Sequence, residues 1–74
     1  MKVTLKVRVL KEYIARQNLT QNEFGERVGS SSGFMAQLLH GTRQPSAYTR
    51  ARLCKTTKLS FDDLFLIEPE EEGK

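Results

Sequence analysis

The stretch from Gln21 to His40 constrains the fold most strongly, because its small and apolar residues are spaced as two short helices crossing at a steep angle require. Thr20 and Glu23 match the T-x-x-E pattern of a capping box. In such a box the Thr20 hydroxyl accepts from the Glu23 amide and the Glu23 carboxylate accepts from the Thr20 amide. The first helix is therefore predicted to begin at Gln21.

The end of this helix is predicted at Gly29, because glycine tolerates the positive φ of a helix C-cap. Phe24 and Val28 lie four residues apart and share one face of the helix. Gly25 beside them removes a side chain at a place where a second helix would otherwise collide. The sequence thus predicts a short helix that packs closely against the element after it.

A second helix is predicted after this turn, and Ser30 and Ser31 can cap it. Met35 and Leu38, three residues apart, form its inner face. The residues left on the outer face are Ser32, Gly33, Ala36 and Gln37. A face that is small and polar and carries one long amide can lie in the DNA major groove and offer Gln37 to an adenine edge.

Together these residues resemble the Cro and phage-repressor type of helix-turn-helix protein, also called the Xre-like family. The matching positions are Leu19-Thr20-Gln21, Gly25, Gly29, Met35, Leu38 and the exit His40-Gly41-x-x-x-Pro45. The resemblance extends from Leu10 to Phe65 and implies an all-α fold, a compact five-helix, lambda-repressor-like helix-turn-helix domain. A short N-terminal strand is a possible addition to it. We assign this domain to residues 1–67 and expect residues 68–74 to form a disordered acidic tail.

The resemblance implies a small transcriptional regulator of the repressor type that binds double-stranded DNA, with a recognition helix over Ser31–Leu39 in the major groove. The positions that match base-reading residues are Ser31, Ser32, Gly33 and Gln37, and the positions expected at phosphates are Gln21, His40 and Arg43. The sequence departs from the family at Gly33, which offers no side chain to a base, and at Phe34, where the family usually has a small polar residue. For His40, a solvated loop residue is nearly as good an interpretation.

The distribution of charge favours a polyanionic partner. The chain carries 12 Lys and Arg against 9 Asp and Glu, but residues 68–74 hold four of the acids and one of the bases. Residues 1–67 therefore have 11 bases and 5 acids, a net charge of +6. A strongly basic body attracts nucleic acid. A basic surface that serves only solubility fits the charge about as well.

The chain contains one cysteine and one histidine, which limits the disulfides, metal sites and catalytic sites that it can form. Cys54 has no partner for an intramolecular disulfide, and His40 lies beside a glycine turn with no nucleophile or metal-ligand cluster near it in sequence. We therefore expect no enzyme activity, cofactor, metal or small-molecule substrate. The sequence has no apolar run long enough to span a bilayer and no signal-peptide core at its start, so we expect a cytoplasmic protein without a membrane partner.

The first residues fit two periodicities. An alternating strand pattern is formed by Val3, Leu5, Val7 and Val9, and a helical face is formed by Val3, Val7, Leu10 and Ile14. We expect a helix over Lys6–Gln17 and an extended Lys2–Leu5. The extended piece is interpreted either as a paired strand or as a frayed terminus.

Ile14 and Leu39 stand where many phage repressors carry an arginine in helix 1 and a glutamate near the end of helix 3, paired with each other. Losing one member would leave a buried charge unpaired, at a cost of roughly 3–5 kcal/mol, whereas replacing both with hydrophobic residues can be neutral. We therefore expect Ile14 to pack against Leu39.

Two more helices are predicted after the loop that follows His40. Ser46 can cap a helix that runs to Thr57. The residues expected on its inner face are Ala47, Ala51, Leu53, Cys54 and Thr57. Ser60 and Asp63 match an S-x-x-D cap, which predicts one last short helix.

The run from Leu64 to Ile67 is more apolar than a chain of 74 residues can readily hide. The resemblance implies a homodimer through this region, and we assign Phe65, Leu66 and Ile67 to its interface. Alternatively, the run is partly extended and pairs with Val3–Val7, within or between chains. The same run supports a competing function, a protein-interaction module of the antitoxin or anti-repressor type.

Overall fold

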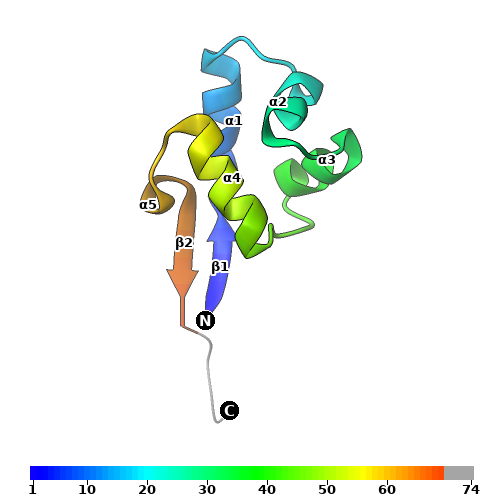
Figure 1. Cartoon of the computed structure of the whole chain (residues 1–74). Helices are drawn as coiled ribbons and strands as arrows, with labels where there is room; N and C mark the ends of the chain where they lie inside the picture. Colours follow the sequence, from blue (N-terminus) through cyan, green and yellow to red (C-terminus); the bar gives the residue numbers. More distant parts are fainter. Residues whose placement is uncertain (70–74) are drawn as a thin grey trace.

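Five helices and one small sheet make up residues 1–69, the part of the chain that this computed structural model describes (Figure 1). The elements in chain order are β1 (Lys2–Leu5), α1 (Val7–Arg16), α2 (Gln21–Val28), α3 (Ser32–His40), α4 (Ala47–Thr57), α5 (Phe61–Leu64) and β2 (Phe65–Glu68). The fold is mostly helical. The short N-terminal strand that the fold prediction allowed for is present as β1, and it pairs with β2 in an antiparallel sheet.

The helices after α1 are capped by residues predicted from the sequence, but α3 is shifted by one residue from the predicted Ser31–Leu39. Side-chain hydroxyls accept backbone N–H groups at the starts of α2, α3, α4 and α5, from Thr20, Ser31, Ser46 and Ser60. The capping box before α2 is confirmed, because Thr20 N donates to Glu23 Oε1 at 2.8 Å and Glu23 N donates to Thr20 Oγ1 at 3.1 Å. The backbone hydrogen bond from Thr20 stabilises the ionised carboxylate and so lowers the pKa of Glu23.

The two strands pair within the chain and form a ribbon below the helical body (Figure 1). Leu5 lies opposite Phe65 and Val3 lies opposite Ile67, which confirms the interpretation that the C-terminal apolar run is extended and pairs with the N-terminal segment. Because strand side chains alternate between faces, Phe65 turns into the core and is only 2% exposed. Phe65 is a core residue, which corrects its assignment to a dimer surface.

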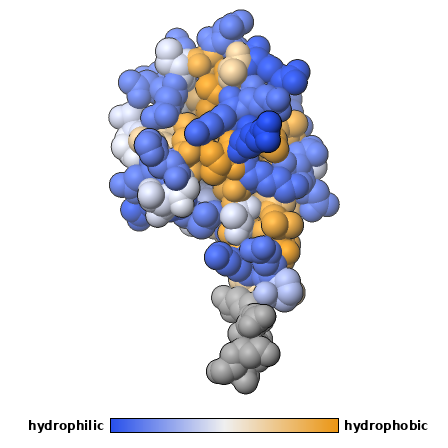
Figure 2. Space-filling model, turned by 180° about the vertical axis from the view of Figure 1, so that it is seen from behind, coloured by the Kyte–Doolittle hydropathy of each residue, from blue (hydrophilic) through white to orange (hydrophobic). Residues whose placement is uncertain are grey.

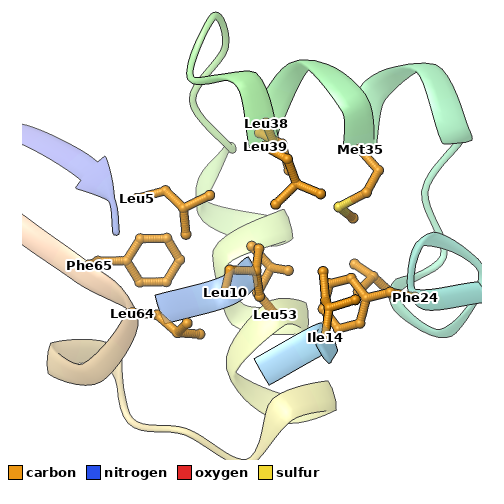
Figure 3. Close-up of a cluster of buried hydrophobic side chains, with 11 residues drawn as sticks. Leu5, Leu10, Ile14, Phe24, Met35, Leu38, Leu39, Leu53, Leu64 and Phe65 are labelled. Carbon is orange, nitrogen blue, oxygen red and sulfur yellow. The ribbon is translucent and has the colours of Figure 1, made fainter. Parts of the chain in front are cut away.

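One hydrophobic core joins all of these elements (Figure 3). Its buried residues are Leu5, Leu10, Ile14, Phe24, Val28, Met35, Leu38, Leu39, Leu53, Leu64 and Phe65. Ile14 and Leu39 are both buried in it, on the neighbouring helices α1 and α3. Their direct contact stays a prediction.

Helix α4 presents only part of the predicted face to the core, and the predicted Cys54 is half-buried against the core. Leu53 and Thr57 are buried, but Ala47 and Ala51 are exposed. Arg52 lies half-buried instead, and its Nε donates a hydrogen bond to the carbonyl of Val28 at the end of α2. The inner face of α4 thus includes the long polar side chain of Arg52, whose guanidinium reaches the end of α2. Hydropathy alone would assign this side chain to the outer face.

The predicted acidic tail begins inside the sheet. Glu68 is the last residue of β2 and lies opposite Lys2. The expectation for residues 70–74 lies outside the described residues. The helical domain and its ribbon therefore extend one residue beyond the boundary assigned from the sequence.

Candidate nucleic-acid interface

A tight turn at Gly29 sets the angle between α2 and α3. Gly29 has φ 85°, and the amides of both Gly29 and Ser30 donate to the carbonyl of Gly25 at 2.9 Å. A side chain on Gly29 would be strained by this φ, and its Cβ would lie 3.1 Å from Arg52 Nη2. Glycine is therefore strongly favoured at position 29, which was predicted as the helix end.

Gly25 is under a weaker constraint than the sequence suggests. It is buried between the helices, but a Cβ added there would lie 3.5 Å from the Ser30 carbonyl oxygen and 3.7 Å from Met35 Cβ. These are ordinary van der Waals distances. An alanine would fit, so the interpretation that only glycine avoids a collision at position 25 is wrong.

Arg52, on α4, stabilises this turn through a hydrogen bond to its backbone. Its Nε donates to the Val28 carbonyl, one of the terminal acceptors that α2 leaves without a partner of its own, and its guanidinium carbon lies 5.9 Å from the centre of the Tyr48 ring. The hydrogen bond joins residues 24 apart in sequence, so no local pattern could have indicated it.

The exposed side of α3 has no side chain at Gly33, near the start of the helix, and a polar side chain at Gln37, one turn later. Ser32, Gly33 and Gln37 are exposed, and no described atom lies within 4 Å of a Cβ added at Gly33. Gly33 and Gln37 are four residues apart and share one helix face. Ser31 is the N-cap, and its hydroxyl oxygen accepts from the amide of Phe34 at 3.1 Å. Three of the four base-reading candidates thus lie on α3 itself, and Ser31 also serves as its cap.

The structure brings Gln37 and Arg43 together, although they were predicted to act separately. Arg43 Nη1 donates to Gln37 Oε1 at 3.2 Å, and the guanidinium carbon of Arg43 lies 5.4 Å from the centre of the Phe34 ring. Phe34 and Gln37 are three residues apart on α3, which the sequence shows, but the approach of Arg43 depends on the loop conformation. The contribution of Phe34 to this cluster was missed.

The other two phosphate candidates lie at helix ends. Gln21 is the first residue of α2 and His40 is the last residue of α3, and both are exposed. Gly41 follows His40 with φ 80° and ends α3. Within the described part of the chain, no hydrogen bond connects either residue to Gln37 or Arg43.

Comparison with known proteins identifies the family. The chain is 31% identical over 61 residues to the "uncharacterized HTH-type transcriptional regulator YgzD" of Bacillus subtilis (strain 168), an alignment that covers 82% of this chain and 92% of that protein. The chain belongs to the HTH-type transcriptional regulators. This HTH-type regulator is also 29% identical over 62 residues to an "uncharacterized HTH-type transcriptional regulator" of Archaeoglobus fulgidus, with 84% of this chain and 87% of that protein aligned. No family model and no solved structure matches it.

Acidic residues are absent from one long segment of this HTH-type regulator, which carries only basic charges. Residues 27–61, which include α3, the loop after it and α4, contain six Lys and Arg and no Asp or Glu. The acids of residues 1–67 are Glu12, Glu23, Glu26, Asp62 and Asp63, on α1, α2 and α5. The segment that carries Gln37 and Arg43 is thus uniformly basic, which favours contact with a polyanion.

Residues 1–69 show no metal site, ligand pocket or membrane-spanning helix. No group of His, Cys, Asp and Glu side chains in this range could hold a metal ion, and no pocket opens between its elements. None of the helices described is long and apolar enough to cross a membrane. Cys54 is half-buried, and this burial raises the pKa of its thiol. The exposed side of α3 with its basic surroundings is therefore the strongest candidate site in the described structure of this HTH-type regulator.

Proposed function

We propose that this HTH-type regulator is a Cro- or phage-repressor-like, Xre-like transcriptional repressor that binds double-stranded DNA with α3 in the major groove. The observation that carries the proposal is the outward side of α3, where Gly33 and Gln37 are exposed on one face of a helix within an acid-free basic segment. The major groove is wide enough to admit an α-helix, an outer face without acidic side chains avoids repulsion by the phosphates, and Gly33 would let the backbone approach closely.

Contacts to the DNA backbone are assigned to the ends of the two helices. Gln21 stands at the N-terminus of α2, where backbone N–H groups and the helix dipole both favour a phosphate. His40 can donate a hydrogen bond to a phosphate in either charge state. On α3, Ser32 and Gln37 would face bases, and Ser31 would add its hydroxyl proton, since its oxygen already accepts from Phe34.

Binding to duplex DNA should be strong at low salt and fall steeply as salt rises. Duplexes selected from a random pool would supply the cognate site, and a scrambled duplex of equal length would be the control in electrophoretic shift titrations. The logarithm of the binding constant should fall linearly with the logarithm of salt, by about 0.9 for each phosphate contact. No shift on any duplex would reject the proposal and favour the competing protein-interaction module.

A homodimer is the proposed binding unit. Leu66 and Ile67 are 48% and 49% exposed on β2, and apolar surface continues from the helical body onto the ribbon (Figure 2). A two-stranded ribbon is only marginally stable by itself, so a second copy that covers an exposed apolar face of it would stabilise it. A twofold dimer would place its two α3 helices on half-sites about 34 Å apart in a palindromic operator.

Leu66→Glu should shift this dimer toward monomer, because a carboxylate would be buried in an apolar contact. DNA affinity should fall with it, since each half-site would then be bound alone. Sedimentation velocity over a range of concentrations measures the first effect and shift titrations the second. Ala15→Glu adds the same charge at an exposed site on α1 and is the control. An unmodified protein that stays monomeric at high concentration, free and on DNA, would exclude the proposed interface.

A further inference from the structure

The contact between Gln37 and Arg43 places a cation in the middle of the α3 face. Arg43 Nη1 donates to Gln37 Oε1 at 3.2 Å, and the guanidinium carbon lies 5.4 Å from the centre of the Phe34 ring. Phe34 and Gln37 are one helix turn apart on α3. Wherever Gln37 meets DNA, the charged group of Arg43 is therefore present too.

The loop that carries Arg43 is fixed on both sides of it. On one side, the Thr42 amide and hydroxyl both donate to the carbonyl of Gln37, at 3.1 Å and 3.2 Å. On the other side, the Gln44 side chain accepts a hydrogen bond of 2.9 Å from the amide of Leu5 in β1. Arg43 is thus held between two anchored neighbours, and its side chain lies along α3.

This arrangement changes which base each residue can read. A glutamine reads adenine by accepting from the amino group and donating to N7 at the same time, and here Gln37 Oε1 already accepts from Arg43. An arginine has a rigid fork of N–H donors, so one hydrogen bond to Gln37 leaves enough donors for a bidentate contact. The bidentate partner of arginine in the major groove is guanine, through O6 and N7.

We propose that Arg43 and Gln37 act as one base-reading unit, in which Arg43, stacked on Phe34 and held by Gln37, selects a guanine in each half-site. Gln37 Nε2 then donates to an acceptor on the neighbouring base pair. The inference rests on the proposed function and gives Arg43 a role in specificity, where the sequence indicated a phosphate contact. The ligand of this unit is the edge of a guanine in the major groove of duplex DNA.

Lysine substitution separates the two roles of Arg43. Lysine keeps the charge and can still neutralise a phosphate, but it lacks the planar fork that makes two parallel hydrogen bonds and stacks on a ring. Wild-type protein and Arg43→Lys would be titrated onto the duplex recovered by selection with the wild type. The same duplex with the guanine pair changed to adenine is the second probe, and Arg16→Lys, an exposed exchange on α1, is the control.

The wild type and Arg16→Lys should prefer guanine over adenine by roughly 5- to 150-fold at this position. Arg43→Lys should lose most of this preference while its affinity for scrambled duplex and its salt slope stay unchanged. A cycle with Gln37→Ala and Arg43→Ala should be non-additive on the cognate duplex, because each residue needs the other for its geometry.

Two results would overturn the inference in different ways. If Arg43→Lys keeps the wild-type base preferences and Arg43→Ala weakens binding to all duplexes equally, Arg43 is a phosphate contact and the proposed function stands. If the wild type itself shows no preference for any selected duplex over scrambled DNA, the proposed function and this inference both fail.

Discussion

Replacing Ile14 with arginine should remove most of the stability of this domain. Ile14 is 8% exposed in the core, so the guanidinium would be buried without a partner, at a cost of roughly 3–5 kcal/mol. Small domains are stable by only about 5–15 kcal/mol, and 74 residues place this one toward the lower end. Urea and thermal unfolding followed by circular dichroism would measure the loss. Ala15→Arg puts the same group on the exposed side of α1 and should change stability little.

Adding Leu39→Glu to Ile14→Arg should recover part of that loss. Leu39 is 6% exposed on α3, which packs against α1, and a glutamate there would give the buried arginine a partner. The double-mutant cycle isolates the interaction from the cost of each single change. If the two changes are simply additive, the side chains do not meet, and the pairing of α1 with α3 expected from the phage-repressor resemblance is wrong in register.

Features whose partners lie within one helix turn were predictable from sequence. The capping box of Thr20 and Glu23 joins residues three apart, and Gly29 ends α2 because of its own φ. The cap of α5 by Ser60 has the same local character. In each case the residue types and their spacing define the geometry without help from the rest of the fold.

From the sequence, the sheet was one of two interpretations of the N-terminal segment, because its stability depends on residues far apart in the chain. Val3 and Leu5 fit a strand, but Val3 and Val7 also fit a helix, and the choice is decided by β2, whose paired residues lie 60 or more positions later. Once β2 pairs, the alternation of the strand turns Phe65 inward and leaves Leu66 outside. Half of the apolar run thus belongs to the core, which its composition could not reveal.

The sequence predicted individual residues of the candidate site, but it did not predict that they contact one another. Helical spacing alone put Gln37 outward on α3, because Met35 and Leu38 define the buried side. The loop has no such periodicity, and the contact of Arg43 with Gln37 and Phe34 depends on how the loop folds back onto α3. The error in α4 has a related origin, since small residues such as Ala47 carry little periodic signal.

Gly33→Glu should abolish DNA binding while the domain stays folded. No described atom lies within 4 Å of a Cβ at this position, so the longer side chain would meet only solvent. Replacing glycine within a helix raises helix propensity, and an acidic group in the first turn of α3 is favoured by the helix dipole. The melting temperature should therefore be equal to that of the wild type or higher. Bound to DNA, however, the carboxylate would face the polyanion at close range.

Like charges forced together at an interface cost several kcal/mol, so affinity for cognate and scrambled duplexes should both fall by roughly a hundredfold or more. Ala15→Glu, with the same charge on α1, should retain near wild-type affinity, because α1 is not expected at the groove. Shift titrations at one fixed salt concentration, with melting curves for every variant, complete the comparison. Wild-type binding by Gly33→Glu would mean that the start of α3 does not face DNA. The exposed apolar side of the ribbon would then become the surface on which to look for a partner.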